Sequence, residues 1–315
     1  MPKIMLKVIL FFSVTALTGC LDNQQNEFGA PTAGYVQVDA GKLFYEKFGS
    51  GEPILVVHGA GMGHTCFLPQ MLELAKDYQL IFYDQRGSGK SLDAALGPQY
   101  VNIEKFTKDL EDLRSQLNLE KVVLVGHSWG GFLAMNYALE YPHHVSKLIL
   151  LDSAASNYEG QKAFEKEFAK RLEPIQDKIA PFYHLEDFQK LSAEEMGNLY
   201  RNLFVAHFAN PNNIKYLTID SDKKSILSGY QVCMEMSRTS WPKPEANLLP
   251  HLPNLKVPTL IIHGDRDVIP LYTAQQTKNA MPHAKLVCLK NCGHFPFIEQ
   301  QEKTFEEIRK FLQTE

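Results

Sequence analysis

One segment of this 315-residue chain joins an apolar strand, a sharp turn and the start of a helix: Val122-Val123-Leu124-Val125-Gly126-His127-Ser128-Trp129-Gly130-Gly131. Its leading residues form a continuous apolar run, which is typical of a strand covered on both faces. The residues that follow match Gly-x-Ser-x-Gly, whose glycines leave room for a tight turn that exposes the serine. We therefore predict that Ser128 stands at the end of a central strand as a candidate nucleophile.

Short apolar runs alternate with helical stretches on both sides of this segment. An opening hairpin is predicted over 35–39 and 43–48, and further strands over 54–57, 80–83, 148–151, 260–262 and 286–289. Helical periodicity predicts helices over 103–117, 130–140, 271–280 and 304–312. This alternation predicts an α/β fold, with a mostly parallel twisted sheet flanked by helices.

Residues 154–250 interrupt that alternation, because they contain helix-like segments but no strand-like apolar run. They lie between two predicted strands of one sheet. We therefore predict an inserted helical cap, with the α/β core formed by 35–153 together with 251–315.

Composition excludes several classes of protein. The chain is 44% hydrophobic and 22% charged, so it can bury a sizeable core and is not disordered. Its net charge of −4 argues against a nucleic-acid-binding face.

Two glycine-rich segments resemble nucleotide sites only in part. Gly59-x-Gly61-x-Gly63 has His64 where a dinucleotide fingerprint needs glycine, and 87–91 has Asp84 where a P-loop needs its first glycine. We predict no nucleotide, and no metal ion or organic cofactor.

Histidine, serine and aspartate gather at the predicted strand ends. The carboxyl ends of parallel strands meet at one edge of a sheet, which is where such folds place their sites. The residues concerned are His58, Asp84, Ser128, Asp152, His263 and, just after the last strand, His294.

The chain after its first residues resembles the α/β-hydrolase family. Within that family, Asp84-Gln85-Arg86-Gly87-Ser88-Gly89-Lys90-Ser91 and Gly126-His127-Ser128-Trp129-Gly130-Gly131 resemble the proline iminopeptidase group. The resemblance implies a serine hydrolase that acts through an acyl-enzyme intermediate as a proline iminopeptidase-like aminopeptidase, on a small molecule or a short peptide. That group carries His-Gly-Gly-Pro-Gly where this chain has His58-Gly59-Ala60-Gly61-Met62. Carboxylesterases and lactonases of the same fold therefore stay alternatives, as does a non-catalytic binding lipoprotein.

The family's chain order, serine then acid then histidine, implies the remaining catalytic residues. His294 follows the last strand at the correct end of the sheet, whereas His283 precedes that strand. The family spacing Gly-x-x-Asp selects Asp267 as the acid, with Asp265 and Asp152 as alternatives.

The resemblance also implies two backbone donors for an oxyanion, the N–H groups of Ala60 and Trp129. An aminopeptidase must in addition hold the α-ammonium of its substrate with a carboxylate. Glu235 is the candidate, because it stands among apolar residues near the point where the cap returns to the core.

The N-terminus predicts a lipoprotein signal. Lys3 and Lys7 precede an apolar run over 8–17 that is too short to span a bilayer. Leu17-Thr18-Gly19-Cys20 then resembles the bacterial lipobox, which implies a signal peptide over 1–19.

The lipobox implies that Cys20 is acylated and that 20–34 forms a tether, so the protein would be lipid-anchored on the periplasmic side of a bacterial cell envelope. Leu21 in place of aspartate favours the outer membrane in a Gram-negative cell. Four further cysteines, which we expect to be mostly buried and structural, leave any disulfide pairing open: Cys66, Cys233, Cys288 and Cys292.

Overall fold

The computed structural model describes residues 31–219, 222–239, 241 and 243–314. The predicted signal peptide, Cys20 and the tether up to residue 30 lie outside the described residues. Strand β1 begins at Thr32, so the end of the predicted tether already belongs to the sheet.

Eight strands form one twisted sheet in the order β1-β2-β4-β3-β5-β6-β7-β8. Strands β1 and β2 form the predicted antiparallel hairpin, β2 runs antiparallel to β4, and all other neighbours are parallel. The predicted α/β fold is confirmed. The strands are β1 (Thr32–Val38), β2 (Gly41–Phe48), β3 (Pro53–Val57), β4 (Gln79–Tyr83), β5 (Val122–His127), β6 (Val145–Leu151), β7 (Thr259–Gly264) and β8 (Lys285–Leu289).

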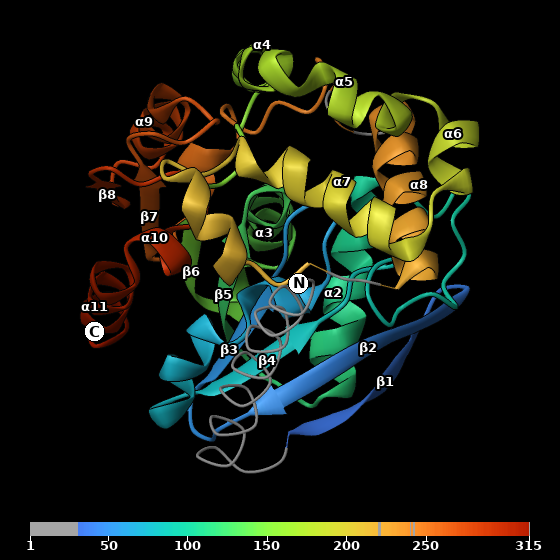
Figure 1. The fold of residues 1–315 in the computed structure, drawn as a ribbon. Helices are drawn as coiled ribbons and strands as arrows, with labels where there is room; N and C mark the ends of the chain where they lie inside the picture. Colours follow the sequence, from blue (N-terminus) through green and yellow to red (C-terminus); the bar gives the residue numbers. More distant parts are fainter. Residues whose placement is uncertain (1–30, 220–221, 240, 242, 315) are drawn as a thin grey trace, which may run out of the picture.

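Helices cover both faces of the sheet (Figure 1). Side chains alternate along β5, so that Val122 and Leu124 join the apolar layer beneath α2 and α3, while Val123 and Val125 join the layer beneath α10 and α11. This double burial explains why the strands are continuously apolar. The core helices are α2 (Ile103–Gln116), α3 (Trp129–Glu140), α9 (Leu271–Ala280), α10 (Pro296–Glu299) and α11 (Gln301–Leu312).

Between β6 and β7 the described chain forms helices joined by loops. These helices gather in the upper part of Figure 1, over the end of the sheet, and they enclose an apolar cluster of their own that includes Phe188, Tyr200 and Ile226. They are α4 (Tyr158–Leu172), α5 (Gln176–Ile179), α6 (Leu185–Lys190), α7 (Ala193–Val205) and α8 (Lys223–Thr239). The described residues of 154–250, which include these helices and the loops between them, are called the cap below.

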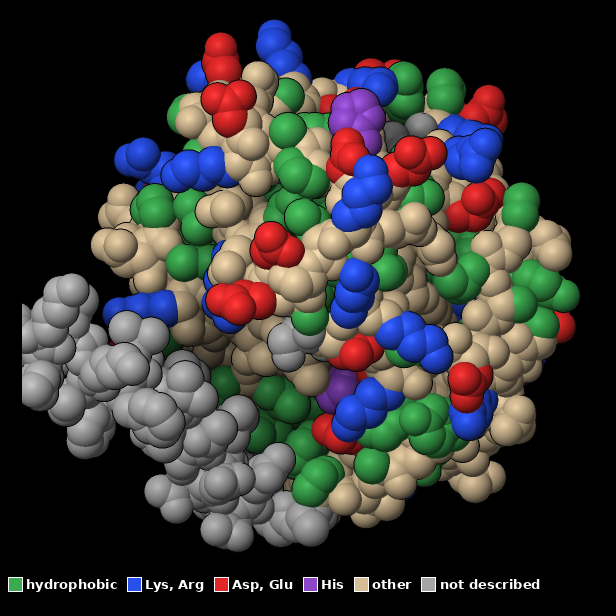
Figure 2. Space-filling model, turned by 45° about the vertical axis from the view of Figure 1, so that its right-hand side comes forward, with side chains coloured by type: hydrophobic (Ala, Val, Ile, Leu, Met, Phe, Trp, Pro, Cys, Tyr) green, Lys and Arg blue, Asp and Glu red, His purple; other side chains and the backbone are tan. Residues whose placement is uncertain are grey.

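Acidic and basic side chains are interspersed on the face that Figure 2 shows, so the described residues of this face do not form a field of one sign. Within the described part of the chain, every helix is too short or too polar to cross a lipid bilayer.

Candidate active site

Ser128 lies between β5 and α3 in a strained backbone conformation. Its φ and ψ are 57° and −126°, a combination that residues with a side chain rarely adopt. A Cβ added at Gly126 would lie 2.4 Å from the carbonyl oxygen of Gly130, and a Cβ added at Gly130 would lie 2.2 Å from that of Val57. Close backbone approach therefore requires both glycines, and the turn leaves Ser128 at the N-terminus of α3.

His294 and Asp267 meet at the carboxyl edge of the sheet. Asp267 follows β7, and His294 lies between β8 and α10. Nδ1 of His294 lies 3.0 Å and 3.2 Å from the two carboxylate oxygens of Asp267, and both side chains are buried. His294 and Ser128 line the same cavity. The structure thus brings together the three residues that the chain order implied.

The protonation of His294 suits proton abstraction. Burial lowers the pKa of His294 to about 3, so the imidazole is neutral at ordinary pH. Its single ring proton belongs on Nδ1, where it is donated to Asp267. Nε2 then carries the free electron pair that a general base requires.

The alternative residues lie elsewhere or make other contacts. Oδ2 of Asp265 lies 3.7 Å from Nζ of Lys290. Asp152 is buried and accepts a hydrogen bond of 2.8 Å from the amide of Gly264. His283 precedes β8, so it lies at the opposite end of that strand from His294.

The expected oxyanion donors lie beside Ser128. Ala60 and Trp129 line the cavity that Ser128 and His294 share. A Cβ added at Gly59 would lie 3.1 Å from Cβ and 3.5 Å from Oγ of Ser128, so the loop after β3 passes directly over the serine. Trp129 opens α3, and the first N–H groups of a helix have no partner within it. Both segments can therefore present N–H groups to an oxyanion at this point.

Gln85 links these two segments, and sequence reasoning missed it. Its Oε1 accepts a hydrogen bond of 3.0 Å from the indole Nε1–H of Trp129, and its Nε2 donates one of 2.6 Å to the carbonyl of His58. Its backbone amide donates to Nε2 of His58 at 3.0 Å. The available signal was its place after β4, between Asp84 and Arg86, at the same edge of the sheet.

Two further histidines hold the loop that carries His294. Nε2 of His127 donates a hydrogen bond of 2.8 Å to the carbonyl of His294. The amide of His294 donates one of 2.8 Å to the carbonyl of His207, which belongs to the cap. The ring centroids of His127 and His207 lie 4.7 Å and 5.2 Å from that of His294. The core and the cap therefore position the same loop.

The cavity above Ser128 has a volume of about 190 Å³ and is mostly aromatic. Burial lowers the pKa values of its three histidines, His127, His207 and His294, so their rings are neutral. Among the described residues that line it, none carries a formal charge. The cap contributes Phe164, Phe168, Phe182, Tyr200, Leu203, Phe204, Tyr230 and Cys233.

Glu235 lies outside this lining. It is two residues from Cys233 on α8, and two helical residues differ by about 200° in direction, so the two side chains leave opposite faces. The Glu235 side chain is 17% exposed, and its carboxylate lies 3.9 Å from Nη1 of Arg238. The structure therefore pairs Glu235 with a cation of its own helix and does not aim it at Ser128.

The segment that resembles a P-loop tail surrounds a carboxylate of the protein itself. The amide of Lys90 donates to Oδ2 of Asp84 at 2.8 Å, and a Cβ added at Gly89 would lie 2.2 Å from that carboxyl group. Beside it, Arg86 forms a buried ion pair of 2.7 Å with Asp109. Asp84 and Arg86 thus make structural contacts.

The cysteines of the described chain are all free thiols. Cys66 and Cys292 are buried, whereas Cys233 and Cys288 are partly buried. Burial raises the pKa of the Cys233 thiol to about 11, so it is protonated at ordinary pH.

Comparison with known proteins places this geometry in a family. The sequence pattern of the alpha/beta hydrolase fold matches residues 52–301. A proline iminopeptidase of Heyndrickxia coagulans is 28% identical over 294 residues, which cover 89% of this chain and 98% of the relative. The AB hydrolase superfamily protein YisY of Bacillus subtilis is 30% identical over 275 residues, covering 85% of this chain and 94% of that protein.

Among solved structures, a thermophilic esterase from Thermogutta terrifontis aligns with a TM-score of 0.62 and 25% identity, covering 90% of this chain and 98% of the esterase. The chain belongs to the alpha/beta hydrolase fold family.

Proposed function

We propose that this hydrolase is a serine carboxylesterase in which Ser128, His294 and Asp267 form the catalytic triad. The observation that carries the proposal is the neutral His294, which is hydrogen-bonded to Asp267 and lines one cavity with Ser128 on its strained turn. Serine needs an adjacent base to become a nucleophile, and an acid that orients the base.

In the proposed reaction, Oγ of Ser128 attacks the carbonyl carbon of the ester while its proton passes to Nε2 of His294. The N–H groups of Ala60 and Trp129 stabilise the oxyanion that forms. His294 returns the proton to the leaving alkoxide as the bond to the acyl carbon breaks. Water, deprotonated by His294, then hydrolyses the acyl-enzyme by the same steps.

The cavity favours a neutral, apolar acyl group. An ammonium ion that enters an apolar site loses its hydration and needs a carboxylate in return. The described lining offers aromatic rings, and Glu235 lies outside it. An aminopeptidase specific for N-terminal proline is the second candidate, supported by the similarity to relatives of that name.

A matched pair of substrates separates these candidates. The p-nitrophenyl esters of cyclopentanecarboxylic acid and of proline have acyl rings of the same size and differ by an ammonium group. Desolvation of an ion costs several kcal/mol, and 1.4 kcal/mol is tenfold, so we expect kcat/KM to be at least about 100-fold higher for the carbocyclic ester at pH 6.5. The difference should narrow above about pH 8, where an α-amino group loses its proton.

A fluorophosphonate probe tests the nucleophile independently. We expect the purified protein to be labelled and the Ser128→Ala variant to stay unlabelled. Equal turnover of both esters at pH 6.5 by a labelled protein would assign the enzyme to the peptidase class, whereas an unlabelled wild-type protein would make it a binding protein of the same fold.

We also propose that a lipid on Cys20 anchors the enzyme in a bacterial cell envelope, with the outer membrane favoured in a Gram-negative cell. The motif over 17–20 supports this. A Cys20→Ser variant should lose incorporation of a palmitate analogue and leave the membrane fraction while keeping its esterase activity. A variant that stays membrane-bound after removal of its signal would refute the anchor.

A further inference from the structure

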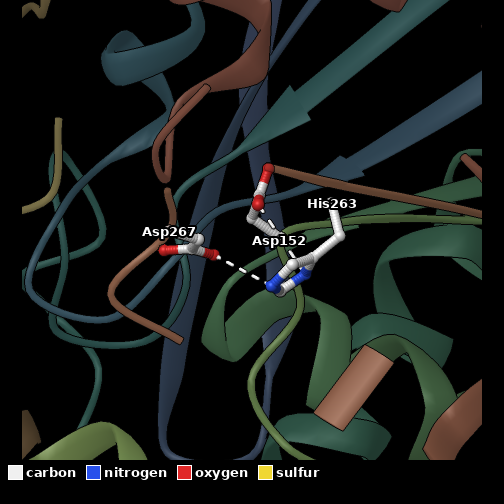
Figure 3. A group of neighbouring side chains, drawn as sticks. All are labelled: Asp152, His263 and Asp267. Carbon is white, nitrogen blue, oxygen red and sulfur yellow. Dashed lines mark ion pairs between the residues drawn. The ribbon is translucent and has the colours of Figure 1, made fainter. Parts of the chain in front are cut away.

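Three buried side chains lie directly behind the proposed triad. Asp152 follows β6, His263 belongs to β7 and Asp267 follows β7. Figure 3 shows the three groups close together, with dashed lines that join the His263 ring to the carboxyl groups of Asp152 and Asp267. Their polar atoms lie within 4.8 Å of one another. Two carboxyl groups therefore share one site that excludes water.

Asp267 receives most of the hydrogen bonds in this cluster. Its Oδ1 accepts from the backbone amide of Ile269 at 3.1 Å and from Nδ1 of His294 at 3.0 Å. Its Oδ2 also lies 3.5 Å from Nε2 of His263, although that nitrogen donates its proton to the carbonyl of Ile269 at 2.8 Å. These donors favour the ionised form of Asp267.

Asp152 accepts fewer hydrogen bonds than Asp267 does. Its Oδ1 accepts from the amide of Gly264 at 2.8 Å and lies 3.7 Å from Nδ1 of His263, beyond hydrogen-bond distance. Its Oδ2 has no partner among the described residues if the group is taken as a carboxylate. An ionised carboxylate with an unpaired buried oxygen beside a second carboxylate is costly, whereas a protonated one can donate to its neighbour.

The pKa shifts of the two aspartates also favour a protonated Asp152 beside an ionised Asp267. Burial, followed by the adjacent charge of Asp267, raises the pKa of Asp152 well above its usual range. Burial also raises the pKa of Asp267, but the electrostatic interaction with His263, the hydrogen bond from Asp152 and that from Ile269 oppose this effect. One proton is therefore held by the pair, and it belongs on Asp152.

We infer that Asp152 is a positioning residue, which in its neutral form donates a hydrogen bond to the Asp267 carboxylate and thereby fixes the group that orients His294. The inference rests on the proposed triad and deepens it. Asp152 does not line the cavity of Ser128; it acts through Asp267, whose carboxylate it helps to hold in the orientation that meets His294.

Two substitutions of Asp152 test this role. Asp152 has a φ of 41°, a conformation that asparagine and glycine tolerate better than alanine. Asp152→Asn keeps an N–H donor for Asp267 and a carbonyl for Gly264, so kcat should stay within about threefold of the wild type. Asp152→Gly removes the donor, and kcat should fall at least tenfold while KM changes little. Asp267→Asn, the matched control, should lose about 10⁴-fold because the imidazole adopts the wrong tautomer.

Other outcomes would overturn the inference. A reversed pattern, with Asp152→Asn inactive and Asp267→Asn active, would make Asp152 the ionised triad acid. Near-normal kcat in both Asp152 variants would leave it without a positioning role. Activity lost on dialysis against EDTA and restored by a divalent metal would assign the cluster to a cation. Circular dichroism shows whether the Asp152→Gly variant is unfolded. If it is, the difference in kcat between Asp152→Asn and Asp267→Asn tests the inference. Failure of the proposed triad itself is recognised separately, because the wild type would then not react with the fluorophosphonate.

Discussion

Replacing Gln85 by methionine tests how the two oxyanion segments are held together. Methionine has a similar length but cannot hydrogen-bond strongly to either partner. The indole N–H of Trp129 and the carbonyl of His58 would both lose a buried partner, at 3.0 Å and 2.6 Å respectively. A buried polar group left unpaired costs about 1–3 kcal/mol. Gln85→Met should therefore lower the free energy of unfolding by about 2–6 kcal/mol, a large part of the 5–15 kcal/mol of a typical domain.

Urea denaturation followed by tryptophan fluorescence measures this change. Trp129→Phe removes the indole donor from the same hydrogen bond, so the double variant should be less destabilised than the sum of the two single variants by about 0.5–3 kcal/mol. We also expect kcat to fall more than KM rises, because displaced N–H groups bind the transition state less well. A loss below about 0.5 kcal/mol for Gln85→Met, with additive single variants, would refute the proposed link between the segments.

Further predictions concern the site and the stability of the fold. Ser128→Ala should lower kcat by about 10⁴- to 10⁶-fold, whereas Asp265→Asn should leave it almost unchanged; steady-state kinetics compares them. Gly130→Ala should destabilise the protein by about 1–3 kcal/mol in urea titrations, because its Cβ would lie 2.2 Å from a carbonyl oxygen. Gly197→Ala in α7 should instead stabilise the protein by about 0.4–1 kcal/mol, because its Cβ would have nothing within 4 Å. Burial lowers the pKa of His207 well below its usual range, so below about pH 6.5 the unfolded chain binds a proton that the folded chain excludes, and stability falls with falling pH. His207→Phe should reduce that slope by up to about 1.4 kcal/mol per pH unit, and an unchanged slope between pH 4 and 6.5 would contradict the assignment.

Local patterns were sufficient for the fold and for the strained turn at Ser128. Continuous apolar runs predict doubly covered strands because both faces of a central strand need apolar side chains, and β5 shows this alternation between two layers. The conformation of Ser128 could be anticipated because the glycines that permit it lie within two residues of it in the chain. Such inferences need only neighbours in sequence.

Contacts between distant segments required the tertiary structure. Asp265 and Asp267 are two residues apart in one loop, yet only Asp267 meets His294, while Asp265 faces Lys290. Family spacing selected Asp267, the one of the two that contacts His294, but composition and hydrophobic pattern could not. Gln85 and His207 acquire their roles from partners more than forty residues away in the chain, such as Trp129 and His294.

Substrate preference is the property that the sequence predicts least well. Glu235 stands among apolar residues in the sequence, and this made it a plausible partner for an ammonium ion. The side of α8 that meets the cavity, however, depends on how the cap packs on the core. That packing turns Cys233 inward and Glu235 toward Arg238. The sequence by itself determined the sheet and the serine turn, because these follow from local patterns. The uncharged aromatic cavity and the burial of Asp152 beside Asp267 were decided by tertiary packing, because they arise only where separate loops and helices exclude water together.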